Sequence, residues 1–349
     1  ELGPDEKRRV LNPPLTFPRQ EAMLAIHWHP EFIPMDLIDR RIKKMFPNPK
    51  ESLIIPTQHN VPMSYENHTG VEVDCYSRGF NQKVQLLLHF RAENAEKATV
   101  LSAMLDHTFS YRASQLFDFI ETITRPVDER IDRAAGETGS GEDLIAFVRI
   151  YVKKIRTLLD QYESLLPKDV YKNKLLRNFF DGLRPQYGDE AINRAQTFLK
   201  AVKQDVKAHF PYTYFYRTSE IIEEARRYGA GIVIPHPEQF WPILLAEYDV
   251  DGYEVWNPQS RRYTEFLISV LHEKNRKRRQ GERQLLIFMG DDTHMSEKIR
   301  PAEVRDQAKA LREIGYQPAW EDLNVRKKLI CADMDKKTVI REYADRLAG

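Results

Sequence analysis

Cysteine is scarce in this chain, and long apolar runs are absent from it. The sequence has 2 cysteines, Cys75 and Cys331, which lie far apart and form no Cys-x-x-Cys pair. A disulfide framework is therefore excluded, and a reducing, cytoplasmic setting is expected. No apolar run approaches the length of a membrane span, and no signal peptide is visible. Because the sequence begins at Glu1 rather than Met, the possibility that a presequence has been removed stays open.

An excess of charge of either sign is also lacking. Lys and Arg number 53, Asp and Glu number 52, and the formal net charge is +1. This balance predicts no broad nucleic-acid surface and no attraction to an anionic membrane. With 42% hydrophobic and 30% charged residues, the 349-residue chain has the composition of a globular protein with a sizeable core. Its length allows one large α/β domain or two medium ones.

Short apolar runs occupy both ends of the chain, whereas stretches with helical spacing and few glycines fill its middle. We therefore predict an α/β domain from residues 1–93 and 218–349, with a helical C-terminal tail, interrupted by a helical insertion or cap at 94–217. The connection after the third run is too short for a crossover helix, so the third and fourth strands are expected to pair locally. The predicted strands are 22–26, 53–55, 70–73, 84–90, 231–234, 252–256 and 285–289.

Most of these runs have a histidine or an acid at or near their C-terminal end. In a barrel of parallel strands the C-terminal ends converge on one mouth, so these side chains would meet there. Imidazole and carboxylate groups bind divalent metals, so their convergence predicts a multinuclear metal site. Trp28, between two of the candidates, is expected to point away from them because neighbours on a strand alternate faces. The candidates are His27, His29, His59, Glu72, His89, His236, Glu254, Asp292 and His294.

The motifs at these strand ends follow a distinctive order. They read His-Trp-His at 27–29, Thr-Gln-His-Asn at 57–60, Gly-Val-Glu at 70–72, Leu-His at 88–89, Pro-His-Pro at 235–237, Gly-Tyr-Glu-Val-Trp-Asn at 252–257 and Gly-Asp-Asp-Thr-His at 290–294. This order resembles the PHP (polymerase and histidinol phosphatase) family over roughly residues 20–93 and 218–300. The resemblance implies a distorted (β/α)7 TIM-like barrel with a site for two or three Zn, Mn or Fe ions. It also implies phosphoester hydrolysis by a metal-bound hydroxide.

Carried over by position, the resemblance divides the metal ligands among three ions. It implies that the first ion is bound by His27, His29, Glu72 and Asp292. It implies that Glu72 bridges to a second ion, which His89 and His236 complete. The third ion would be served by His59 and His294.

The sequence departs from the family pattern in three places. Gln58 stands where an acid usually precedes the histidine of the second strand, and Asp291 stands where a serine is usual. The ligand expected shortly after the His-Trp-His motif is not evident, since Glu31 and Asp36 are the nearby acids. We therefore do not count Asp291 as a ligand, and the third ion is the one that these departures affect.

The resulting hypothesis is a metal-dependent phosphoesterase acting on a small phosphorylated compound or a nucleotide. A protonated Asp292 or His294 would assist the leaving group, and the insertion would cap the mouth of the site. Arg261 and Arg262 follow a strand and would clamp a substrate phosphate, although a surface ion pair fits them equally well. Two alternatives stay open: a catalytically inactive PHP-like metal-binding interaction module, and a metal-dependent hydrolase of a non-phosphate bond.

Overall fold

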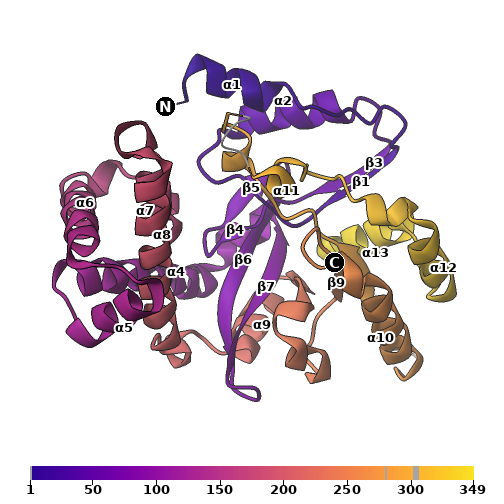
Figure 1. Ribbon diagram of the computed structural model, residues 1–349. Coiled ribbons are helices and arrows are strands. Elements are labelled where there is room, and N and C mark those ends of the chain that lie inside the picture. The colour runs from indigo at the N-terminus through magenta and orange to yellow at the C-terminus, as the bar shows by residue number, and fades with distance from the viewer. Residues whose placement is uncertain (1, 280, 302–305) are drawn as a thin grey trace. The chain divides into compact units, whose positions relative to one another are not determined.

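A long β-hairpin forms the middle of the largest sheet (Figure 1). In the computed structural model, which describes residues 2–279, 281–301 and 306–349, β6 (His68–Ser77) pairs antiparallel with β7 (Gln82–Arg91) along its full length. This confirms the expected local pairing of the third and fourth strands. The run Leu86–Leu88 is fully buried because β7 lies between β6 and β8, and both of its faces are covered.

The hairpin belongs to a seven-stranded sheet of order β10-β9-β8-β7-β6-β4, with β5 paired to β6. β4, β8, β9 and β10 run parallel to β6, and β7 is antiparallel to its neighbours β6 and β8. Two smaller parallel pairs join β1 to β3 and β2 to β11. The remaining strands are β1 (Ala22–Ala25), β2 (Trp28–His29), β3 (Glu51–Ile54), β4 (Gln58–His59), β5 (Met63–Tyr65), β8 (Gly231–Ile234), β9 (Gly252–Trp256), β10 (Leu286–Met289) and β11 (Thr293–His294).

The fold is mixed α/β, with more residues in helices than in strands. Its described strands form three separate sheets that do not close into a ring, so a (β/α)7 barrel is not confirmed. The pairing breaks between β1 and β2 and between β10 and β11, where the candidate ligands His27 and Asp292 lie. Asp292 has φ 47°, a left-handed conformation that cannot continue a strand.

Helix α13 connects the separate sheets through one buried face. It packs Val339, Ile340, Tyr343 and Leu347 against strands of two sheets, β1 and β3 of one and β7, β8 and β10 of the other. Their 3-4 residue spacing places these apolar side chains on one side of the helix. The α-helices of this part of the chain are α1 (Pro4–Leu11), α2 (Met35–Met45), α3 (Ala92–Lys97), α9 (Thr218–Arg226), α10 (Thr264–Arg276), α11 (Gln307–Ala310), α12 (Leu323–Cys331) and α13 (Lys336–Ala348) itself.

The chain divides into two compact units, which are Glu1–Thr108 with Phe215–Gly349, and Phe109–Tyr214. The second unit is helical and has its own apolar core, in which Phe119, Phe180 and Phe198 are fully buried. Its helices are the C-terminal part of α4 (Thr99–Thr124), α5 (Asp128–Thr138), α6 (Glu142–Gln161), α7 (Lys174–Asp181) and α8 (Arg184–Ala208). Among the described helices, none is both long enough and apolar enough to cross a membrane.

Candidate metal centre

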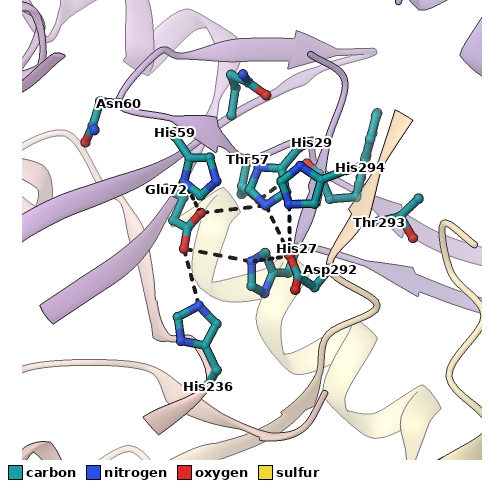
Figure 2. A network of polar contacts seen from close by, with 12 residues as sticks. His27, His29, Thr57, His59, Asn60, Glu72, His236, Asp292, Thr293 and His294 are labelled. Carbon is teal, nitrogen blue, oxygen red and sulfur yellow. Dashed lines mark hydrogen bonds and ion pairs between the residues drawn. The ribbon is translucent and has the colours of Figure 1, made fainter. Parts of the chain in front are cut away.

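Seven of the predicted side chains form one cluster, in which five histidines lie around the carboxylates of Glu72 and Asp292 (Figure 2). They come from the ends of short strands or the turns that follow them, except Glu72, which lies within β6. Their possible ligand atoms form three overlapping groups, and within each group these atoms lie within 4.8 Å of one another. The groups are His27, Glu72 and His236; His27, His29 and Asp292; and His29, His59 and His294.

Local backbone geometry explains how the His-Trp-His motif supplies two ligands. Extended residues two apart share a face, so His27 and His29 point to the same side. Trp28 points the other way and is fully buried in a separate apolar cluster, where its ring meets Tyr65 at 6.2 Å between centroids. The expected orientation of Trp28 is confirmed, and its burial anchors both histidines.

The distances between the candidate ligand atoms suit a shared cation. Oδ1 of Asp292 lies 3.8 Å from Nε2 of His27 and 3.5 Å from Nε2 of His29. Oε1 of Glu72 lies 3.4 Å from Nε2 of His236 and 4.0 Å from Nε2 of His27. Most of these separations are too long for good hydrogen bonds. They match the spacing of about 3–4 Å that follows when two ligands bind one ion at bonds of about 2.0–2.2 Å.

Several of these atoms also lack hydrogen bonds although they are buried. Both oxygens of Glu72 and Nε2 of His27 and His29 have no hydrogen-bond partner among the described residues. Buried polar atoms without partners cost free energy, and a functional centre is a common reason for keeping them. Nδ1 of His59 makes an ion-pair contact of 2.6 Å with Oε2 of Glu72 from the more exposed side of the cluster. The donor set therefore fits divalent metal ions.

The charge states of Glu72 and His29 also suit metal binding. Burial opposes ionisation of Glu72, but His59, His236 and His27 outweigh it and hold the pKa of this carboxyl well below its ordinary value. Burial, together with the neighbouring His294 and His59, holds the pKa of His29 well below its ordinary value. A carboxylate and a neutral imidazole are the forms that bind a metal.

Glu254 orients two of the candidate ligands. Its Oε1 lies 2.8 Å from Nδ1 of His27, and its Oε2 accepts a hydrogen bond of 2.8 Å from the backbone N–H of His236. Burial disfavours the charged form of His27, but Glu254 above all, with Asp292 and Glu72, raises its pKa to about 10. A Cβ at position 290 would collide with Oε1 of Glu254, so Gly290 is required here by space. Glu254 thus supports ligands rather than joining one of the three groups.

The outer oxygen of Asp292 is held by two residues that the sequence motifs did not indicate. Nε2 of Gln259 donates to Oδ2 at 2.7 Å, and Nη1 of Arg312 donates to the same atom at 2.8 Å. Arg312 is only 8% exposed and also donates to the backbone carbonyl of Asp292 at 3.1 Å. These contacts leave Oδ1 facing His27, His29 and His294. Arg312 lies 20 residues beyond Asp292, outside every motif, so no local pattern reveals it.

His294 is fixed by the acid that follows the first motif. Oε1 of Glu31 lies 3.3 Å from Nδ1 of His294, and Oε2 accepts a hydrogen bond of 2.9 Å from the backbone N–H of Ser296. Nε2 of His294 lies 3.5 Å from Oδ1 of Asp292. Glu31 therefore orients a candidate ligand. Asp36, the other nearby acid in the sequence, is exposed on α2.

His89 does not join the cluster, contrary to the prediction. Its Nε2 lies 3.0 Å from the carbonyl oxygen of Ile26 and its Nδ1 lies 2.7 Å from the hydroxyl of Tyr343. One consistent tautomer donates from Nε2 and accepts at Nδ1, so both nitrogens are occupied. Burial lowers the pKa of His89 to about 3, so the ring stays neutral. The reason is strand direction: β7 is antiparallel, and His89 pairs with Gly231 at the start of β8, away from its C-terminal end.

The remaining predicted positions lie in different surroundings. Asp291 is fully buried, and its oxygens accept from the backbone N–H groups of Thr293 at 3.1 Å and Gly315 at 2.9 Å. Burial raises the pKa of this carboxyl to about 7. Arg261 and Arg262 are exposed, and their guanidinium groups lie over the rings of Trp256 and Tyr263 at 6.0 and 4.6 Å. Their role as a phosphate clamp stays a prediction.

Comparisons with known proteins add little to this geometry. No family model matches the chain, and no curated protein matches it. One similar solved structure is that of a proposed metal-dependent phosphoesterase from Bifidobacterium adolescentis, with a TM-score of 0.43 and 14% sequence identity. The match covers 91% of this chain and 98% of that one. At this level of similarity, conclusions about function must come from the site itself.

Proposed function

We propose that the chain is a metal-dependent hydrolase, and specifically a phosphoesterase of the PHP type. The observation that supports this proposal is the set of unbonded, buried ligand atoms spaced 3.4–4.0 Å apart around Glu72 and Asp292. The order of the motifs along the chain supports the family and its distorted barrel. Two or three divalent ions, Zn, Mn or Fe, are the proposed cofactors.

Two carboxylates, those of Glu72 and Asp292, would bind the ions together with the histidines. Glu72 presents Oε1 to His27 and His236 and Oε2 to His29 and His59, so its two oxygens face two different pairs of histidines. Asp292 offers Oδ1 to the histidines, while Gln259 and Arg312 hold Oδ2. When bound, divalent ions lower the pKa of water towards neutrality and neutralise charge on phosphoryl oxygens. A carboxylate placed between two ions reduces their mutual repulsion.

His294 is the better of the two proposed leaving-group acids. Burial opposes the charge on Asp292, but the close contacts with His29 and His294 and the charge of His27 keep its pKa well below the ordinary value. Asp292 is therefore ionised and has no proton to give. Burial also opposes the charge on His294, but Asp292 and Glu31 raise its pKa, and 23% of its side chain is exposed. A protonated His294 can thus reach a leaving group.

The proposed substrate is a small phosphorylated compound or a nucleotide. Arg261 and Arg262 follow β9 on an exposed 3-10 helix, Arg261–Tyr263, and are the proposed phosphate clamp. The double charge of a phosphate monoester suits a pair of guanidinium groups.

Metal analysis of protein purified without chelator tests the proposal first. We expect two or three tightly bound divalent ions per chain. His236→Ala and Asp292→Asn should each lose metal, whereas His209→Ala, which removes an exposed histidine of the helical unit, should not. Less than one ion per wild-type chain would overturn the proposal.

A substrate panel then tests the reaction. We expect hydrolysis of an aryl phosphate, a phosphodiester or a nucleotide, with activity lost in His236→Ala and Asp292→Asn and kept in His209→Ala. Activity that survives both site variants would place the reaction elsewhere. Full metal content without hydrolysis of any phosphoester would instead favour the metal-binding interaction module, or a hydrolase of another bond.

A further inference from the structure

The helical unit contains a cavity that the metal centre does not involve. Its volume is about 480 Å³, within the range of about 300–1,000 Å³ that small-molecule sites occupy. α7, with the residue that precedes it, and α8 form most of the wall, and Phe119 of α4 completes it. The lining combines apolar side chains with amide and hydroxyl groups. Leu176 and Leu199 are buried, and Asn173, Asn193 and Thr197 supply the polar atoms.

Three cations line this cavity, and none of them forms an ion pair with a described acid. Within the described part of the chain, no carboxylate lies within ion-pair distance of Arg177, Lys200 or Lys203. Another cation, Arg184 at the start of α8, behaves differently. Arg184 pairs with Asp181 at 3.0 Å and Asp189 at 2.9 Å.

One acid of α7 and one of α8 lie near this cavity, yet both pair with other cations. Oδ1 of Asp205 lies 2.7 Å from Arg133 on α5. Asp181, which accepts a hydrogen bond from the lining residue Gln196, is already paired with Arg184. These two acids are therefore neutralised elsewhere, and no ion pair with a described acid compensates the positive charge of the cavity.

This concentration of positive charge favours the binding of an anion, and of the three cations only Lys203 is partly buried. Lys203 is half-buried, and its burial, together with Arg177 and Lys200, lowers its pKa from the ordinary value. Like charges that face one cavity repel each other, and burial strengthens the repulsion. A bound anion would remove that cost.

We propose that this cavity binds a small organic phosphate with a dianionic head and an apolar body. Arg177, Lys200 and Lys203 meet the two negative charges, and the guanidinium group supplies the planar, bidentate contact that phosphoryl oxygens favour. Leu176 and Leu199 contact the apolar body. The site is independent of the proposed function because every lining residue belongs to the helical unit.

Titration calorimetry with phenylphosphonate tests the proposal. This probe carries the dianionic head and the apolar body, and its P–C bond is not a phosphoester that the chain could cleave. The full chain with His236→Ala should be used beside the wild type, so that binding at the metal centre is separated from binding at the cavity. We expect saturable binding of about one equivalent to both proteins, with a Kd in the millimolar range or tighter.

Two variants of the lining decide the outcome. Lys203→Met and Arg177→Met keep an unbranched apolar side chain and a similar helix propensity but remove one charge each. We expect each to weaken binding about tenfold or more, whereas Lys153→Met, an exposed position on α6, should leave it unchanged. Circular dichroism confirms that each variant is folded.

Two further probes test the chemistry of the ligand. Benzenesulfonate, with one negative charge, should bind more weakly than phenylphosphonate, and so should methylphosphonate, which lacks the apolar body. The proposal is overturned if wild-type protein shows no saturable binding at millimolar phenylphosphonate, if neither lining variant weakens it, or if His236→Ala abolishes it.

Discussion

At the scale of single residues, the metal centre depends on side chains that hold the ligands in place. Arg312 and Gln259 bind Oδ2 of Asp292, Glu254 binds Nδ1 of His27, and Glu31 binds Nδ1 of His294. Each contact engages the polar atom of the side chain that faces away from the cluster. Such contacts fix the orientation of a ligand before an ion arrives, which reduces the entropy lost on binding.

Arg312→Lys should lower metal affinity without emptying the site. A lysine provides one point of charge instead of the planar guanidinium that reaches both Oδ2 and the backbone carbonyl of Asp292. We expect the dissociation constant to rise by about tenfold or more, as measured by competition with a chromogenic chelator. Arg326→Lys, at an exposed position on α12, is the matched control. Equal affinity in both variants would show that Arg312 does not position Asp292.

His89→Gln should keep the metals and change the dependence of stability on pH. Burial lowers the folded-state pKa of His89 to about 3, whereas the unfolded value is about 6.5. Between these values the unfolded chain binds more protons, so stability rises with pH. The contribution of His89 is complete above about pH 6.5 and is lost as the pH falls towards 3.

Chemical unfolding at pH 7 and at pH 5 measures this effect. Wild type should be more stable than His89→Gln at pH 7, and the difference should shrink at pH 5. Metal content should equal that of wild type at pH 7. Loss of metal from this variant would instead indicate that His89 is a metal ligand.

At the scale of elements, one helix determines how the strands are held together. Tyr343 of α13 is fully buried, stacks edge-on with Phe288 of β10 at 4.8 Å between ring centroids, and reaches His89 of β7. Gly231 at the start of β8 has no side chain, which leaves room for the Tyr343 ring. A single aromatic side chain thus contacts three strands of the large sheet.

Substitution of Tyr343 should separate packing from hydrogen bonding. Tyr343→Ala should lower the free energy of unfolding by about 3–5 kcal/mol because it leaves a cavity among strands. Tyr343→Phe keeps the ring and loses only the hydroxyl bonded to His89, so we expect a loss of about 1 kcal/mol. Denaturant titration measures both. Equal losses in the two variants would contradict the packing role of the ring.

At the scale of the whole molecule, the three candidate metal groups all lie in one of the two compact units. The helical unit has its own core, so its stability does not depend on metal ions bound in the other unit. Ligand binding stabilises the part that binds, by about 2.7 kcal/mol when free ligand is a hundredfold above Kd.

Removal of the metals should therefore destabilise one unit selectively. After treatment with a chelator, we expect faster hydrogen exchange at residues 26–30, 57–60 and 290–296. Exchange in α6 and in the later part of α8 should be unchanged. Mass spectrometry of peptides from treated and untreated protein measures this difference. A uniform change across both units would contradict it.

Seven of the eight predicted ligands lie in one cluster, and the sequence alone could indicate them because short apolar runs and the polar residues beside them are local patterns. Their role as metal ligands stays a prediction. It was also sufficient for the β6–β7 hairpin, because the connection between these strands is too short for anything else. Composition and charge excluded a disulfide framework and a broad basic surface. These inferences need no knowledge of which segments lie side by side.

Only the tertiary structure decided the features that depend on pairing and direction. His89 was misassigned because convergence of strand ends holds for parallel strands, and β7 is antiparallel. Arg312 and Gln259 reach Asp292 from loops that no spacing rule connects to it. The cations of the cavity in the helical unit could be recognised only from the tertiary structure, which shows which cations the nearby acids pair with. In each case the decisive contact joins residues that the local pattern of the chain does not link.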